Sequence, residues 1–134
     1  MRKQRLIMTA MKEKRGYSAH VNIGHTFIGT QASSLPALRD KILDAANLAA
    51  GAGTYRDEDI VLRPDLRSFF DFYNVVNAKA LSARIGMHQS LLAQYVSGIK
   101  RPSREQTHRI LQGVRQVGRE LAGMKFGERQ KSSE

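Results

Sequence analysis

Four polar side chains lie close together in the C-terminal half of the chain: His88, Gln89, Ser90 and Gln94. A glutamine amide carries donor and acceptor groups, which match the N6 and N7 atoms that adenine presents in the major groove. Gln89 and Gln94 could each recognise adenine if this stretch forms a helix lying in that groove. His88 and Ser90 would then contact neighbouring base edges. We expect these four residues to read the bases of duplex DNA.

Basic side chains flank this stretch on both sides. Lysine and arginine bind phosphate oxygens, which fix the register of a protein on DNA without reading the sequence. We expect phosphate contacts from four of them: Lys79, Lys100, Arg101 and Arg104.

The composition agrees with a polyanionic partner. The 134 residues include 22 Lys+Arg against 12 Asp+Glu, giving a net charge of +10. This excess favours nucleic acid first and an acidic membrane surface second. The absence of cysteine excludes disulfide scaffolds, thiolate zinc sites and thiol nucleophiles. No apolar stretch is long enough for a spanning helix or a signal peptide, so we expect a cytoplasmic protein.

The histidines do not indicate an enzyme. His20 and His25 lie on either side of a predicted turn, but no carboxylate lies nearby in the sequence to complete a metal site. The acidic Asp57–Asp59 segment is typical of a loop or helix cap. There is no glycine-rich phosphate loop. We therefore expect no catalytic residue, no metal and no cofactor.

The elements that must position His88–Gln94 are two helices joined by a short turn. A steep crossing of such helices needs a small residue, supplied by Ser82, and a turn residue that tolerates positive φ, supplied by Gly86. Ile85, Leu92 and Tyr95 are the expected apolar anchors of this unit. Gly98 and Pro102 end the second helix. The spacing predicts a helix-turn-helix.

Residues 66–126, which include the ending Gly98-Ile99-Lys100-Arg101-Pro102, resemble the lambda-repressor-like (XRE-type) DNA-binding domains. The resemblance implies an all-α domain whose second helix enters the major groove. Ser82 stands where that family usually carries alanine, and it is still small.

A long helix is predicted to close the chain, over residues 103–126. Its apolar stripe either completes the helical core or pairs with a second copy, and it consists of Ile110, Val114, Val117, Leu121 and Met124. Pairing would suit two half-sites about 34 Å apart on DNA. Three arginines are expected to form a solvated helix face: Arg109, Arg115 and Arg119.

The first part of the chain reads as strands followed by a helix. Residues 5–12, 17–23 and 26–30 have strand-like patterns, separated by turns at Gly16 and Gly24. Ser33 or Ser34 is the expected cap of a helix that begins near Pro36. Residues 60–62 indicate one further short strand. Three strands and one helix leave a sheet face uncovered, so we expect this unit to pair with a copy or a partner.

The stretch Gly16-Tyr17-Ser18-Ala19-His20-Val21 and the β-β-β-α order resemble HicB-type antitoxins. The resemblance implies a partial RNase-H-like unit that covers a small HicA-like ribonuclease toxin, and a C-terminal domain that binds the module's own operator.

These observations predict an α+β fold with a HicB-like unit over residues 1–58, a helix-turn-helix domain over 59–126 and a disordered tail over 127–134. The expected function is that of an antitoxin that represses its own operon by binding double-stranded operator DNA. The expected assembly is a homodimer or a tetramer. A stand-alone regulator is the alternative, and an RNA-binding or nucleolytic protein is a third.

Overall fold

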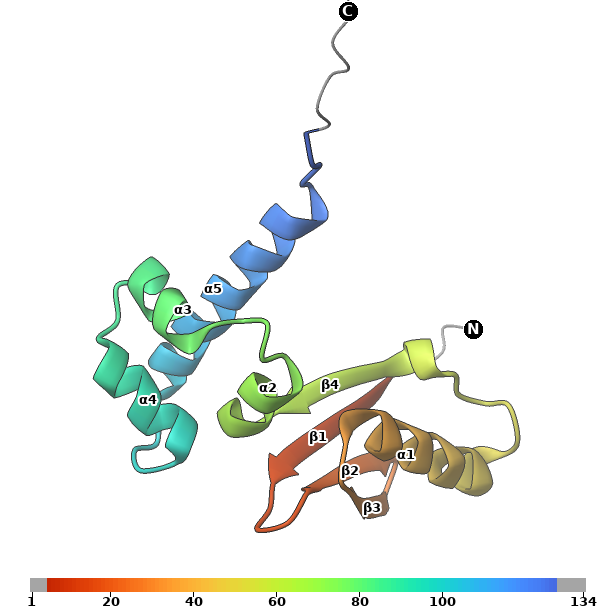
Figure 1. Ribbon diagram of the computed structural model, residues 1–134. Coiled ribbons are helices and arrows are strands. Elements are labelled where there is room, and N and C mark those ends of the chain that lie inside the picture. The colour runs from red at the N-terminus through yellow and green to blue at the C-terminus, as the bar shows by residue number, and fades with distance from the viewer. Residues whose placement is uncertain (1–4, 128–134) are drawn as a thin grey trace, which may run out of the picture.

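The structure, a computed structural model, describes residues 5–127 and has the α+β class that the sequence predicts (Figure 1). All but the first residue of the predicted tail, 127–134, lie outside the described residues. The elements follow in the order β1 (Leu6–Lys12), β2 (Tyr17–Ile23), β3 (Thr26–Ala32), α1 (Leu35–Ala50), the short 3-10 helix η1 (Asp57–Asp59), β4 (Ile60–Pro64), α2 (Leu66–Phe72), α3 (Ala78–Ile85), α4 (Gln89–Ser97) and α5 (Arg104–Ala122).

The strands form a four-stranded mixed sheet in the order β3-β2-β1-β4. β1, β2 and β3 are antiparallel neighbours, and two glycines make their turns. Gly24 has φ +59° between Ile23 and Thr26, which pair across the hairpin. Gly16 has φ +68°, and a Cβ there would lie 2.6 Å from the carbonyl oxygen of Ala32. The turn at Gly16 therefore excludes a side chain on two grounds, its positive φ and this close approach.

The fourth strand was not predicted as part of the sheet. β4 runs parallel to β1, with Leu6 opposite Ile60 and Met8 opposite Leu62. The first residues of the range predicted as a helical domain, 59–126, therefore lie in the sheet. A parallel neighbour needs a crossover, which α1 and the loop after it supply. The local apolar pattern indicates a strand here but does not identify its partner across that crossover.

The core of the first unit lies between one face of the sheet and α1, which crosses that face (Figure 1). Alternate residues of β1 and β2 point into it, as strand geometry requires. Ser34 caps α1 by accepting a hydrogen bond from the Ala37 amide at 3.3 Å. The side chains of this core that are entirely shielded from solvent are Met8, Ala10, Val21, Leu38, Ile42 and Ala46.

Helix α2 joins the sheet to the remaining helices. Asp65 caps it by accepting hydrogen bonds from the Ser68 amide at 2.8 Å and from the Lys12 amide at 3.2 Å. The Tyr17 hydroxyl donates to Asp71 at 3.0 Å, and its ring lies 4.6 Å from that of Phe72. α2 ends at Phe72. The end of the sheet and α2 therefore share one set of contacts.

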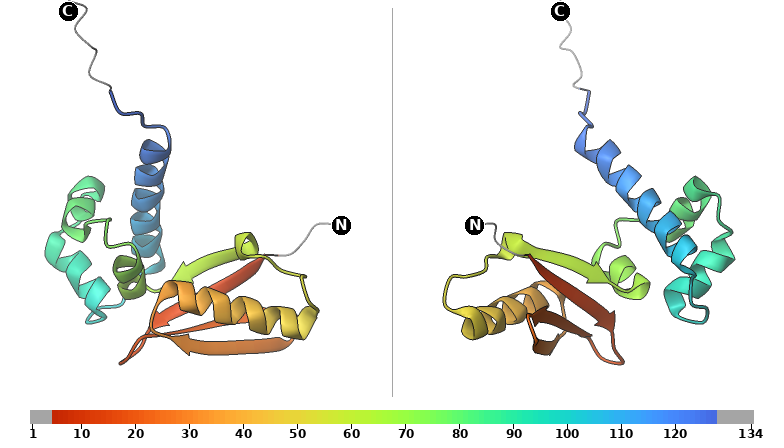
Figure 2. Two further views of the ribbon diagram at one scale, coloured as in Figure 1. Left: turned by 45° about the vertical axis from the view of Figure 1, so that its right-hand side comes forward. Right: turned by 180° about the vertical axis from the view of Figure 1, so that it is seen from behind.

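The last three helices pack around a second small core of Leu81, Met87, Leu92 and Ile110. The N-terminal half of α5 contributes to this core, whereas its C-terminal half points away from α4 and the sheet (Figure 2). Along the predicted stripe, Ile110 is buried and Leu121 is 60% exposed. The first half of the stripe thus completes the core, and the second half is uncovered within the described residues. No described helix is both long and apolar enough to cross a membrane.

We predict that Gly16→Ala destabilises the protein more than Gly24→Ala. Both positions have positive φ, which costs an alanine roughly 1–2 kcal/mol. Only at Gly16 does the added Cβ also meet a backbone oxygen, because nothing lies within 4 Å of the Cβ position at Gly24. Urea unfolding of the two variants measures the difference. Equal decreases in the free energy of unfolding of the two variants would contradict the close approach at Gly16.

We also predict that stability falls at high pH through Tyr17. Burial, and then the hydrogen bond to Asp71 and its charge, raise the pKa of the Tyr17 phenol above 10.0, while Lys12 opposes them. A raised pKa means that the stabilisation is complete below pH 10 and is lost as the pH rises through the folded-state pKa. Unfolding free energies of wild type and Tyr17→Phe, compared across this range, should show a steeper decline in wild type. If the unfolding free energies of the two proteins decline in parallel with pH, the raised pKa of Tyr17 is contradicted.

Candidate nucleic-acid interface

The turn between α3 and α4 sets the direction of α4. Gly86 adopts the left-handed conformation at φ 66° and ψ 34°, and its amide donates to the Ala83 and Ser82 carbonyls. The Met87 amide donates to the Ser82 carbonyl oxygen at 2.9 Å, which continues the capping of α3. Ser82 is 3% exposed and its hydroxyl donates to the Lys79 carbonyl at 2.6 Å. The turn residue and the small residue expected from the sequence occupy these positions.

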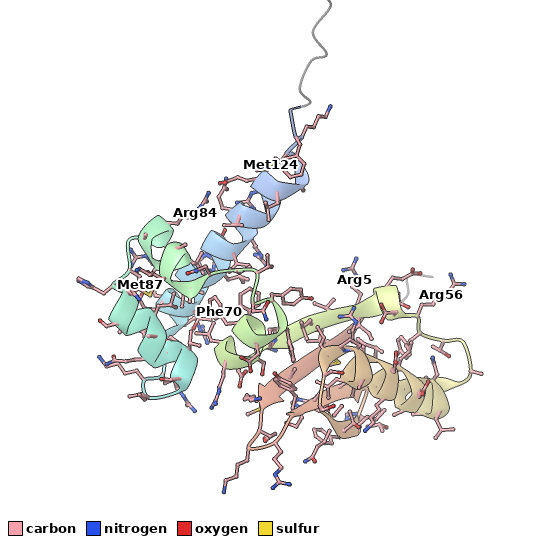
Figure 3. All side chains as sticks on the ribbon, in the orientation of Figure 1. Arg5, Arg56, Phe70, Arg84, Met87 and Met124 are labelled. Atoms are coloured by element: carbon pink, nitrogen blue, oxygen red, sulfur yellow. The ribbon has the colours of Figure 1, made fainter. Side chains whose placement is uncertain are left out.

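One side of α4 is anchored in the core. Leu92 is 1% exposed, and Met87, just before the helix, is 6% exposed. Figure 3 shows Met87 where α3 and α4 meet. The predicted anchors Ile85 and Tyr95 pack against the same core and are partly buried. Met87 is an anchor that the sequence reasoning missed, although an apolar residue directly after the turn glycine was the available signal.

The residues predicted to read bases lie at the N-terminal end of α4, His88 and Gln89, and on the face away from Leu92, Ser90 and Gln94. His88, Gln89 and Ser90 are exposed, and Gln94 is partly exposed one turn further along. His88 stands at the N-cap of α4 without a side-chain capping bond. Within residues 5–127, none of these four side chains makes a hydrogen bond. Their polar groups are therefore available to a ligand.

The predicted phosphate-binding residues surround α4 but do not form one cluster. All four are exposed: Lys79 in the first turn of α3, Lys100 and Arg101 after α4, and Arg104 at the start of α5. Lys100 and Arg101 line an open cleft that also contains Lys12 and Arg67. Lys79 and Arg104 do not line this cleft. The sequence reasoning missed Arg67, because only the folded chain brings α2 close to the end of α4.

Helix α5 holds α3 in place by contacts that were not predicted. Nη2 of Arg109 donates to the carbonyl oxygens of Ile85 at 2.6 Å and Gly86 at 3.0 Å. A cation at these carbonyls also interacts favourably with the negative end of the α3 dipole. Arg109 was expected to belong to a solvated face together with Arg115 and Arg119. It is exposed as expected, and it also caps α3, because the helix crossing brings it to the C-terminus of α3.

A second contact joins α3 to the outer part of α5. The Arg84 guanidinium donates two hydrogen bonds to the Glu120 carboxylate, at 3.1 and 2.6 Å. Arg84 lies on α3 as labelled in Figure 3. The hydrogen bond from Arg84, followed by one from Gln116, lowers the pKa of Glu120 to about 2. Glu120 is therefore ionised at neutral pH and pairs with Arg84 at this helix crossing.

The histidines and carboxylates do not converge on a metal-binding arrangement in the described part of the chain. His20 stacks on Phe27 with ring centroids 5.1 Å apart, and His108 lies 3.4 Å from Gln112. Asp57 and Asp59 belong to η1, and Asp57 pairs with Arg39 at 3.2 Å.

Comparisons with known proteins give no match: no family model, no curated protein and no solved structure is similar to this chain.

We predict opposite effects of alanine at two glycines of α5. A Cβ at Gly113 would overlap Cγ2 of Ile85, so Gly113→Ala must push α3 and α5 apart. At Gly118 nothing lies within 4 Å, and alanine should stabilise the helix by about 0.5–1 kcal/mol. Thermal unfolding should show Gly113→Ala below wild type and Gly118→Ala above it. A stabilised Gly113→Ala would contradict the close crossing of α3 and α5.

Proposed function

We propose that this protein is a sequence-specific DNA-binding repressor whose α4 lies in the major groove. The observation that carries the proposal is the contrast between the buried and the exposed residues of α4. Leu92 is buried in the core, while His88 and Gln89 at the N-terminal end of α4 and Ser90 on the face away from Leu92 are exposed without internal hydrogen bonds. A recognition helix needs this combination, because its core contacts hold it rigid while its first residues reach base edges.

The same arrangement assigns roles to the remaining polar residues. In the proposed complex, Gln89 and Gln94 each bond adenine, and Ser90 and His88 contact adjacent bases. Lys79, Lys100, Arg101 and Arg104 bind phosphates around the groove. The succession of α3, a short turn at Gly86 and α4 is that of a helix-turn-helix, which the lambda-repressor-like resemblance of the sequence also implies.

We propose that the repressor binds as a homodimer through the outer half of α5. Leu121 near the end of α5 is 60% exposed, Met124 just after the helix is 54% exposed, and Val117 is partly exposed on the same stripe. A second α5 packed on this stripe would bury these side chains and produce two α4 helices related by a two-fold axis. Such a pair fits operator half-sites about one DNA turn, or 34 Å, apart.

We further propose that the first unit neutralises a small HicA-like ribonuclease toxin, so that the protein is the cytoplasmic antitoxin that represses its own operon. Three antiparallel strands, a helix and a parallel fourth strand support this proposal. The β-β-β-α order of the first four elements is the one that the HicB-type resemblance of the sequence implies. A stand-alone regulator is the alternative, and it would purify from its host without a small basic partner.

Fluorescence anisotropy with duplex DNA from the region upstream of its own gene tests the DNA-binding role. We expect Gln89→Ala to lose about 1–3 kcal/mol of discrimination between this duplex and a scrambled one. Lys100→Ala should weaken binding to both duplexes alike, because phosphates carry no sequence information. Affinity should fall steeply with salt as counterions are released.

Gln112→Ala is the matched control, because Gln112 is an exposed glutamine on α5 and should not contact the groove. If Gln89→Ala and Gln112→Ala both discriminate as well as wild type, Gln89 does not read bases.

A further inference from the structure

One face of the sheet is left without a covering element by the described chain. α1 and the end of α2 pack on the face that holds Met8 and Tyr17. The opposite face, here called the open face, consists of odd positions 7–11 of β1, even positions 18–22 of β2, odd positions 27–31 of β3 and positions 61 and 63 of β4. In the right-hand view of Figure 2 the molecule is seen from behind, with the strands no longer behind α1.

An aromatic pair is fixed on this open face. The Phe27 side chain is 66% exposed, and its ring stacks on His20 with an interplanar angle of 27°. Gly29 lies beside it, and a Cβ at Gly29 would approach Cε1 of Phe27 to 3.1 Å. The glycine therefore leaves room for the ring to lie along the sheet. The protein thus holds an exposed aromatic surface that it does not use in its own core.

Polar groups and positive charge surround this pair. Across the strands, Arg63 lies opposite Thr9, Thr9 opposite His20, and His20 opposite Gly29. Ser18 and Gln31 pair on the next row, and both line the shallow groove beside Phe27. No position of the open face is an aspartate or glutamate. The surface thus combines an aromatic platform, hydrogen-bonding groups and a cation without opposing negative charge, beside the exposed apolar side chains of Ile7, Met11 and Val61.

We propose that the open face binds single-stranded nucleic acid. Unpaired bases can stack on Phe27 and His20, their edges can bond Ser18 and Gln31, and the phosphates can approach Arg63. A duplex cannot use this surface in the same way, because its base faces are stacked inside the helix. A second copy docking face to face would bring two acid-free surfaces together and offer Arg63 no carboxylate.

The site is separate from α4, so it adds a second nucleic-acid contact to the proposed repressor and stands or falls independently of it. For an antitoxin that represses its own operon, such a face would allow binding to the transcript or to an opened DNA strand as well as to the operator duplex. Those two single-stranded ligands share bases and phosphates and differ in the 2′-hydroxyl.

The test uses the full chain and fluorescein-labelled oligo(U) RNA and oligo(dU) DNA of about 12 nucleotides, which differ only in the 2′-hydroxyl and are within the span that single-strand sites cover. An excess of unlabelled duplex DNA occupies α4 during the anisotropy titration. We expect Phe27→Ala to weaken binding about 5- to 150-fold, the range for loss of base stacking. Phe27 is exposed, so its truncation should leave the fold intact, and circular dichroism checks this.

Phe126→Ala is the matched control, because Phe126 is 92% exposed at the far end of the chain from the sheet. It should bind both oligonucleotides as wild type does. Arg63→Gln should reduce the salt dependence of binding, by about 0.7 in the log–log slope if one phosphate contact is lost. Tighter binding of RNA than DNA would identify contacts to the 2′-hydroxyl, and equal binding would assign the affinity to bases and phosphates alone.

Two results would overturn the proposal. One is an absence of single-strand binding: wild-type protein binds neither oligonucleotide, or the Phe27→Ala variant binds both with the same affinity as wild type. The other is sedimentation equilibrium in which Phe27→Ala converts a dimer to a monomer, which would assign the open face to a second copy. Gln89→Ala provides the separation from α4, because it should leave single-strand binding unchanged whatever it does to the duplex.

Discussion

The burial of Met87 and Leu92 against Leu81 and Ile110 determines which side of α4 faces solvent. These apolar contacts come from three helices and are worth far more than the exposed polar groups on the other side of α4, which interact with water in the free protein. The left-handed Gly86 delivers the chain into this arrangement, and Arg109 stabilises the carbonyls that the end of α3 leaves unpaired. The proposed recognition surface is the consequence of this packing.

The same logic connects the two cores. Asp65 accepts hydrogen bonds from both β1 and α2, and Tyr17 reaches from β2 to Asp71. The sheet unit is therefore joined to the helices through α2 by side-chain and backbone contacts as well as by the chain itself. Residues that the sequence analysis assigned to separate domains meet at this junction. The cleft beside it places Arg67 near Lys100 and Arg101, which gives the helical part an additional cation from α2.

Local features were the ones that the sequence could predict. Gly24, Gly86 and Gly98 stand at positive φ where turns or helix ends were expected, and Ser34 caps α1. Such features depend on a few neighbouring residues. The parallel pairing of β4, the capping role of Arg109 and the close crossing at Gly113 depend on residues far apart in the chain. A pattern of apolar spacing holds no information about such long-range contacts. The strand at residues 60–62 was therefore predicted without its pairing to β1, and the contacts of α5 with α3 were not predicted.

Chemical-shift mapping of the labelled full chain by nuclear magnetic resonance, on addition of the upstream duplex, tests the central claim most directly. The claim predicts the largest changes at the backbone amides of His88, Gln89 and Ser90 and at the side-chain amides of Gln89 and Gln94. The amides of the sheet should change little. Changes confined to the sheet or to the outer half of α5, with α4 unaffected, would contradict the account.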